Sequence, residues 1–93
     1  MSLLLENEIH KRLKNLKDWS YFNKQITKEF KLFDFKEALA FGNKAGVAAE
    51  EMDHHPDILM HSWNKVKISI STHSEGGVTD KDFRLAQKIE SLS

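Results

Sequence analysis

Helical periodicity is strongest in residues 34–52, which read DFKEALAFGNKAGVAAEEM. Apolar and small residues recur there every three or four positions, as on the buried face of a helix. Asp34 is a favourable N-cap residue, and Glu37 follows three positions later as in a capping box. The buried stripe includes Gly42 and Gly46, which lower helix propensity. We therefore expect these glycines to let the helix pack closely against a sheet.

Predicted hairpins lie on either side of this helix. Pro56 restricts the preceding residue to extended backbone and so ends the helical run. The other expected elements are a helix over about 4–17, strands at 19–22 and 26–32 around a turn at Asn23-Lys24, and strands at 57–63 and 66–73 around a turn at Asn64-Lys65. A last helix is expected to begin at Thr79, with Asp82 three residues later in the reciprocal position of a capping box. The order α-β-β-α-β-β-α predicts a single α+β domain over residues 1–93. We expect a four-stranded antiparallel sheet with the helices packed on one face.

Composition excludes several classes of protein. The chain has 14 Lys and Arg, 14 Asp and Glu, five His and no Cys, so its formal net charge is zero. Without cysteine it has no disulfide framework, thiolate metal site or cysteine nucleophile. A formal net charge of zero argues against binding nucleic acid through an overall positive charge. No apolar run is long enough for a membrane span or a secretory signal, so we expect a small cytoplasmic domain.

Acidic side chains gather around an adjacent pair of histidines, His54-His55. Four of them lie within residues 50–57. Carboxylates near an imidazole favour its charged form, although a solvated helix end is the alternative interpretation. His73 precedes a Gly-Gly loop and is a third candidate, because junctions and loops often carry functional residues. His10 is expected on the surface, and packing is the expected role of His61.

The residues favour acid–base chemistry by imidazoles over other kinds of site. The HExxH motif is absent, and no cysteine can complete a zinc site. Ser69 and Ser71 lie on a predicted strand and lack the strained turn that exposes a catalytic serine. Gly76-Gly77 alone does not make a phosphate-binding loop. Imidazoles can donate and accept protons near neutral pH without a cofactor.

Several motifs occur together in one collinear order. Residues 49–57 read AEEMDHHPD, and they are followed by Asn64-Lys65-Val66, Ser71-Thr72-His73, Gly76-Gly77 and Asp82. In this combination the sequence resembles the pterin-4a-carbinolamine dehydratase family over about residues 5–92. It departs from the family in two places. Ile58 stands where members often have tryptophan, and the stretch from Pro56 to Asn64 is one residue longer than in the animal members.

The resemblance implies removal of water from a 4a-hydroxytetrahydropterin, the product left by aromatic amino acid hydroxylases, in support of tetrahydrobiopterin recycling. A hydroxyl leaves C4a and a proton leaves N5, so the reaction needs both an acid and a base. The resemblance implies that the catalytic residues are His54, His55 and His73. The implied substrate-binding and supporting residues are Glu50, Asp53, Pro56, Ser71, Thr72 and Asp82. It implies neither a metal nor a cofactor, because the pterin is the substrate.

Other functions stay open at this point. Animal members of the family also act as dimerisation cofactors of a homeodomain transcription factor, so a non-catalytic binding module is one alternative. Another pterin-related role, such as one in molybdopterin metabolism, is a second. The resemblance implies a homodimer or homotetramer, and large apolar side chains are numerous for so small a core: Trp19, Tyr21, Phe22, Phe33 and Trp63. No direct nucleic-acid or membrane partner is expected.

Overall fold

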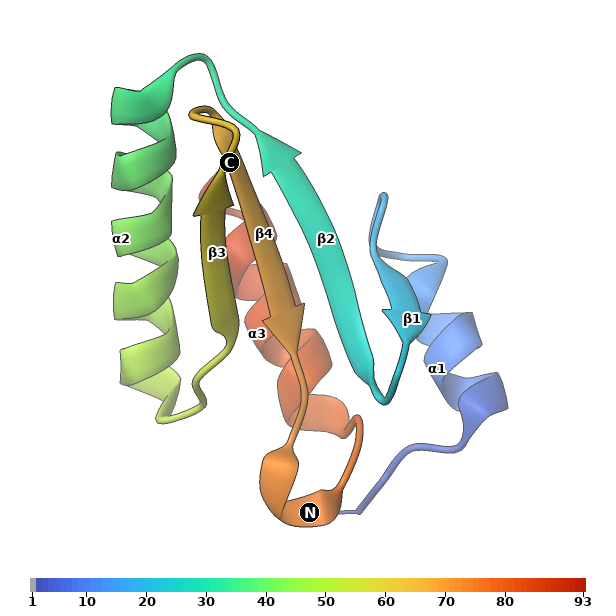
Figure 1. Ribbon diagram of the computed structural model, residues 1–93. Coiled ribbons are helices and arrows are strands. Elements are labelled where there is room, and N and C mark those ends of the chain that lie inside the picture. Colours follow the sequence, from blue (N-terminus) through green and yellow to red (C-terminus); the bar gives the residue numbers. More distant parts are fainter. Residues whose placement is uncertain (1) are drawn as a thin grey trace.

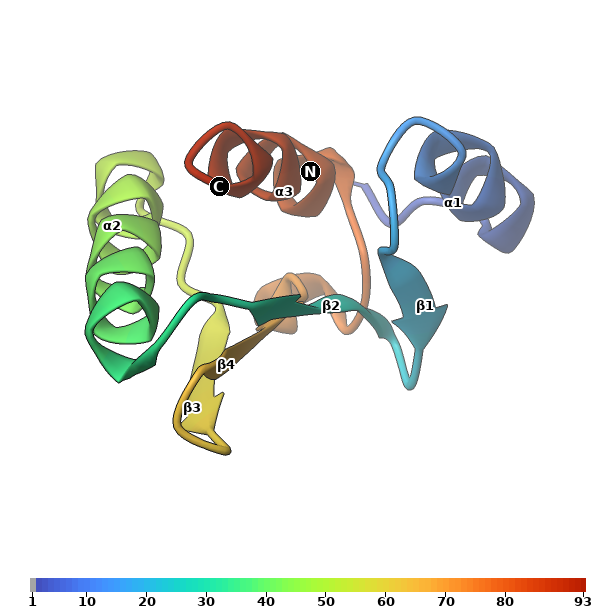
Figure 2. The ribbon, with the colours of Figure 1, turned by 90° about the horizontal axis from the view of Figure 1, so that it is seen from above.

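Four strands form one antiparallel sheet in residues 2–93, the part of the chain that a computed structural model describes. The elements are α1 (Glu6–Leu13), β1 (Ser20–Phe22), β2 (Gln25–Lys31), α2 (Phe35–Met52), β3 (Asp57–His61), β4 (Lys65–Ile70), the 3₁₀ turn η1 (His73–Glu75) and α3 (Asp80–Glu90) (Figure 1). The strand order is β1-β2-β4-β3. Figure 2 shows all three α-helices on the same face of the sheet. The predicted α+β fold is therefore confirmed.

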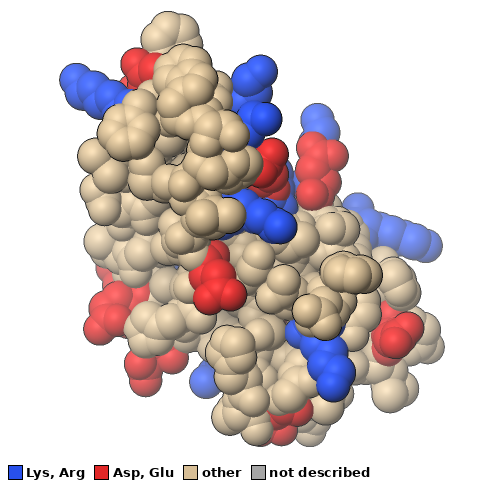
Figure 3. All heavy atoms as spheres, viewed as in Figure 1, with Lys and Arg blue, Asp and Glu red and all other residues tan. Residues whose placement is uncertain are grey.

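Alternate strand residues face the helices and form the core. Val66, Ile68 and Ile70 of β4 are fully buried, and Phe30 of β2 lies opposite Val66. The helices close the core with Ile9, Ala38, Phe41, Ala45, Ala49, Phe83, Leu85, Ala86 and Ile89. The other face of the sheet is uncovered, and charges of both signs are scattered over it (Figure 3).

Lys28 occupies a core-facing position of β2, where an apolar residue is usual, and the pairing of β2 with β4 is continuous through it. It lies between Ile26 and Phe30 on the helix-facing side, opposite Ile68. Its ammonium forms an ion pair with Glu90 at the end of α3, and it lies 4.6 Å from the centroid of the Phe30 ring. The carboxylate therefore compensates for placing a charge beside the core.

Three predicted boundaries are wrong. Helix α1 covers only Glu6–Leu13 instead of 4–17, because the chain turns away before Asp18, which has a left-handed φ of 68°. The second hairpin turns at residues 62–64, since Asn64 is held to Leu32 by two hydrogen bonds and Lys65 already pairs with His61. Strand β4 ends at Ile70, so His73 begins η1 instead of ending the strand.

Close packing does not explain the two glycines of α2, so that expectation is also wrong. A Cβ added to Gly46 would meet no atom within 4 Å, and one added to Gly42 would make only ordinary contacts of 3.9 Å with Ile58 and Met60. Both glycines instead line an open groove between α2 and β3. The volume of this α2–β3 groove is about 610 Å³, and its other lining residues are Leu39, Asn43, Val47, Glu50, Ile58 and Met60.

Candidate functional site

The predicted site residues lie at one end of the sheet, where four chain segments meet. The α2–β3 connection, the end of β4 with η1, the start of α3 and the β1–β2 turn all lie toward the lower end of the view in Figure 1. Antiparallel pairing of β2 with β4 brings the β1–β2 turn to this end, because Ile26 pairs with Ile70. The site is therefore assembled from residues far apart in sequence.

His54 is buried against the carboxylate of Asp82. Helix α2 ends at Met52, and its C-cap residue Asp53 has a left-handed φ of 50°, which turns the chain out of the helix. The amides of Asp53 and His54 donate to the carbonyls of Glu50 and Ala49, which is the Schellman type of helix ending. His54 Nε2 then lies 2.6 Å from Asp82 Oδ1. His54 is 8% exposed and Asp82 is 0% exposed.

The contacts of Asp82 determine which nitrogen of His54 carries a proton. Asp82 Oδ2 accepts hydrogen bonds from Thr72 Oγ1 at 2.9 Å and from the Thr79 amide at 2.7 Å. The hydroxyl of Thr72 has one proton, so Thr79 must donate in the 2.8 Å contact between their hydroxyls. An ionised carboxylate only accepts hydrogen bonds, so in this arrangement His54 Nε2 is the nitrogen that donates to Oδ1. This leaves Nδ1 as the nitrogen that can accept a proton.

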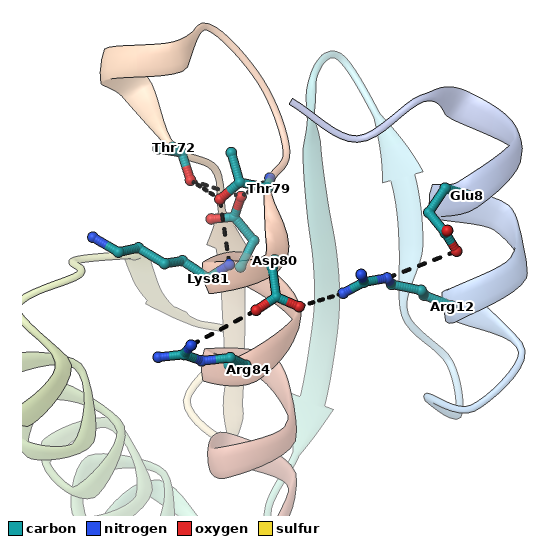
Figure 4. A network of polar contacts seen from close by, with 8 residues as sticks. Glu8, Arg12, Thr72, Thr79, Asp80, Lys81 and Arg84 are labelled. Carbon is teal, nitrogen blue, oxygen red and sulfur yellow. Dashed lines mark hydrogen bonds and ion pairs between the residues drawn. The ribbon is translucent and has the colours of Figure 1, made fainter. Parts of the chain in front are cut away.

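The same carboxylate also caps α3. Thr79 and Asp82 form a reciprocal capping box, as the sequence predicts. Figure 4 shows Thr72 and Thr79 together at the first turn of α3. This turn is also held to α1, because Asp80 forms an ion pair with Arg12 at 2.5 Å; within α3, Asp80 also pairs with Arg84 at 3.7 Å. Asp82 therefore reaches His54 from a helix end that is fixed on two sides.

His55 and Glu50 form an exposed pair beside this buried one. His55 Nε2 lies 2.7 Å from Glu50 Oε1, and the two side chains are 59% and 77% exposed. An exposed ion pair of this kind adds little stability. Its main effect is to orient the His55 ring toward α2, whereas the His54 ring contacts α3.

His73 and Ser71 line a polar hollow of about 280 Å³ at the same end of the sheet. The other lining residues are Asn23, Lys24 and Gln25 from the β1–β2 turn and Gly76 and Gly77 after η1. The loop that carries His73 closes on Thr72, whose amide donates to Gly77 and whose carbonyl accepts from Gly76. Thr72 thus joins the two parts of the site, because its hydroxyl also binds Asp82.

The remaining predicted residues have simpler surroundings. Asp53 is exposed, and its side chain makes no hydrogen bond within residues 2–93, so its visible role is to end α2. Pro56 is half-buried at the start of β3. His10 is exposed on α1 as predicted, but His61 bonds Glu29 and does not pack in the core, which corrects that expectation.

Asn23 and Lys24 were predicted only as a turn, and Gln25 was assigned no role. The signal that could have identified them is the residue pair Asn-Lys in a two-residue turn, where glycine is usual at the second position.

No three His, Asp or Glu side chains gather to hold a metal ion in the described part of the chain. No described helix is long and apolar enough to cross a membrane.

Comparison with known proteins gives consistent matches over the whole chain. Residues 2–92 match the family model of pterin 4 alpha carbinolamine dehydratase. A protein of Sulfolobus acidocaldarius, provisionally named a pterin-4-alpha-carbinolamine dehydratase, is 49% identical over 94% of each chain. One of Metallosphaera sedula, with the same provisional name, is 42% identical over 99% of this chain and 95% of its own.

Two solved structures share the fold. The crystal structure of a transcriptional coactivator/pterin dehydratase from Brucella melitensis has a TM-score of 0.89 at 36% identity and covers 96% of both chains. A pterin dehydratase-like protein identified as a RuBisCO assembly factor in the alpha-carboxysome has a TM-score of 0.64 at 17% identity, over 80% of this chain and 84% of its own. The likeness to the second structure extends to the fold alone.

Proposed function

Because the chain belongs to the pterin-4a-carbinolamine dehydratase family, we propose that it removes water from a 4a-hydroxytetrahydropterin. In this reaction the bond between C4a and its hydroxyl breaks, and the hydroxyl takes up a proton and leaves as water. N5 loses its proton, and the electrons of that bond form the C4a–N5 double bond of the quinonoid product. The proposed substrate is a tetrahydropterin of this class, and the proposed catalysis is by histidines without a metal.

The contact between His54 and Asp82 is the observation that carries this proposal. With Nε2–H donated to Asp82, His54 presents Nδ1 as a proton acceptor. When that nitrogen takes up a proton, the ring becomes a cation, and the adjacent carboxylate stabilises it. We therefore assign removal of the N5 proton to His54. The exposed imidazoles of His55 and His73 are the candidates for the acid that protonates the departing hydroxyl.

The other predicted residues have supporting roles in this scheme. Thr72 holds Asp82 through its hydroxyl and the His73 loop through its backbone. Glu50 orients the ring of His55. Ser71 lines the hollow beside His73, where its hydroxyl can bond a polar edge of the pterin. Ile58 offers a smaller apolar surface than the tryptophan of many family members.

Stopped-flow absorbance tests the proposed reaction directly. The 4a-hydroxypterin is generated in the instrument, and its loss is followed with and without the protein. General acid–base groups contribute about 10²–10⁴-fold, so His54→Ala and His73→Ala should each lower the catalysed rate by about 10²-fold or more. His10→Ala is the matched control, since His10 is an exposed histidine of α1. No acceleration by the unmodified protein over the spontaneous reaction would contradict the proposal and favour a non-catalytic binding module.

We also propose that the protein is a homo-oligomer in which a second copy covers the α2–β3 groove. The groove is largely apolar, and Val47 and Leu39 beside it are 61% and 46% exposed. Gly42 and Gly46 leave its floor free of side chains, which suits the close approach of another helix. Sedimentation equilibrium should show Val47→Glu as a smaller species than the unmodified protein. An unchanged mass would contradict this interface.

The five large apolar residues on which the sequence-based expectation of an oligomer rested are not all exposed. Trp19 is buried, because it packs against Phe30 and donates its Nε1–H to Glu90. Phe22, Phe33 and Trp63 are exposed. Trp19 therefore does not belong to the exposed surface on which the sequence-based expectation of an oligomer rested.

A further inference from the structure

We propose that the polar hollow beside His73 binds an anionic group on the side chain of the pterin, with Lys24 as its cationic partner. This inference rests on the proposed function, because it takes the pterin ring to lie at His54, His55 and His73. It adds a substrate class to that function, namely pterins whose substituent carries a phosphate or a carboxylate.

The lining of the hollow suits an anion. Its side chains are those of Asn23, Lys24, Gln25, Ser71 and His73. Every one of them can donate a hydrogen bond, and Lys24 adds a full positive charge. Among the described residues, no aspartate or glutamate lines the hollow, so no carboxylate there repels an incoming anion. Gly76 and Gly77 complete the wall without side chains.

The charge of Lys24 is not neutralised by the protein. Within residues 2–93 no carboxylate oxygen lies within 4 Å of its ammonium, whereas Lys28 and Lys88 have partners in Glu90 and Glu51. Lys24 is exposed. An incoming anion therefore meets a cation without first having to displace an internal ion pair.

The backbone of Lys24 is held in an unfavourable conformation. Phe22 pairs with Gln25, so Asn23 and Lys24 form a two-residue hairpin turn. Both are left-handed, with φ of 56° and 63°. Asparagine tolerates this conformation, but the second position strongly favours glycine, and a lysine there is strained. Strain of this kind concentrates at functional sites, and here the strained residue is one that lines the hollow.

The hollow adjoins the proposed pterin site through two shared residues. Ser71 and His73 line it and also belong to the predicted site. Thr72, between them in sequence, bonds the carboxylate that holds His54. A pterin ring held by the histidines can therefore extend its substituent toward Lys24.

Equilibrium binding of stable pterins tests the inference. The neutral ligand is 6-hydroxymethylpterin, and the anionic ligands are its phosphate ester and pterin-6-carboxylate, each followed by its own fluorescence. One ammonium–anion contact near the surface gives about a fivefold preference or more, so at low salt at least one anion should bind about fivefold tighter than the neutral ligand. The preference should shrink as salt is added, and comparison of the two anions separates phosphate from carboxylate.

Two lysine variants localise the effect. Lys24→Gln should lower the preference for the anion to nearly one. Lys31→Gln should keep it, because Lys31 is an exposed lysine of β2 that does not line the hollow. A preference that survives in Lys24→Gln would overturn the inference. Equal binding of neutral and anionic pterins by the unmodified protein would also overturn it and leave the proposed reaction standing. Failure of all three ligands to bind would count against both.

Discussion

Replacement of Asp82 by asparagine tests the central contact of the site, because it removes the charge and keeps the shape. Three donors meet at this carboxylate: His54 Nε2 at Oδ1, and Thr72 Oγ1 and the Thr79 amide at Oδ2. An asparagine side chain offers one acceptor oxygen and one donor nitrogen. If its oxygen keeps the two threonine contacts, its nitrogen faces Nε2–H of His54. The ring must then move its proton to Nδ1.

The structure sets the size of the expected effects. Leaving two donors opposed in a buried site costs about 1–3 kcal/mol, and the change of tautomer relieves much of this. We therefore expect the free energy of unfolding to fall by about 1–2 kcal/mol in Asp82→Asn, with the fold retained. The dehydration rate should fall by about 10²-fold or more, because Nδ1 of His54 then carries a proton and cannot accept one. This loss of rate is larger than the small loss of stability would explain.

Three measurements distinguish these effects. ¹⁵N NMR of the histidine ring reports which nitrogen is protonated, urea denaturation gives the free energy of unfolding, and stopped-flow absorbance gives the rate. Asp80→Asn is the matched control, since Asp80 is two residues away, partly exposed, and bonded to Arg12 and Arg84. It should change neither the tautomer of His54 nor the dehydration rate.

Two results would refute this reasoning. One is a proton on Nδ1 of neutral His54 in the unmodified protein, which would mean that Nε2 does not donate to Asp82. The other is an Asp82→Asn variant that keeps both the tautomer and the rate. In that case the carboxylate would serve only as a cap of α3.

Stability measurements test three further features. Lys24→Gly removes a side chain from a left-handed residue, so the free energy of unfolding should rise by about 1 kcal/mol in urea denaturation; a decrease would contradict the turn geometry. Gly46→Ala should stabilise α2 by about 1 kcal/mol, because an added Cβ meets no atom within 4 Å; calorimetry at low protein concentration, where a monomer is favoured, checks this. Glu90→Ala leaves Lys28 and the Trp19 indole without their acceptor, so it should cost about 2–3 kcal/mol. The double change Lys28→Met with Glu90→Gln, whose amide oxygen can still accept from the indole, should recover most of that loss, and failure to recover it would show that the ion pair itself is stabilising.

Local signals account for the parts of the fold that could be predicted. Asp34 accepts a hydrogen bond from the Glu37 amide, and Thr79 and Asp82 cap α3, because capping depends on residues within one turn of each other. Pro56 ends the helical run for an equally local reason. These caps and the periodicity between them are enough to establish the order of the elements.

Contacts between distant residues account for what could not be predicted. Lys28 interrupts the alternation of β2, and its partner Glu90 lies 62 positions away. His54 and Asp82 are separated by 28 positions, and no spacing rule joins a helix end to the first turn of a later helix. The resemblance to a family indicated both residues. Only the structure shows that the Nε2 atom of His54 is the one that contacts the Asp82 carboxylate.

The hollow beside His73 was missed for a related reason. Lys24 lines the same hollow as Ser71 and His73 because β2 pairs with β4. These two strands are neighbours in the sheet, although α2 and β3 separate them in the sequence. In sequence the residue stands only in a turn. Its left-handed backbone, at a position where glycine is usual, becomes informative once its neighbours in space are known.

The position of Asp82 on α3, after both hairpins and α2, has a consequence for how the site is formed during synthesis. A ribosome delivers both hairpins and α2 before it delivers α3, and domains fold as their residues emerge. Until α3 has docked, His54 lacks its acceptor and the Thr72 hydroxyl lacks the carboxylate that it binds. A chain that has not yet reached α3 therefore carries every histidine of the proposed site but not the proton arrangement that the proposed reaction requires. On this proposal, the catalytic arrangement forms only once α3 has docked.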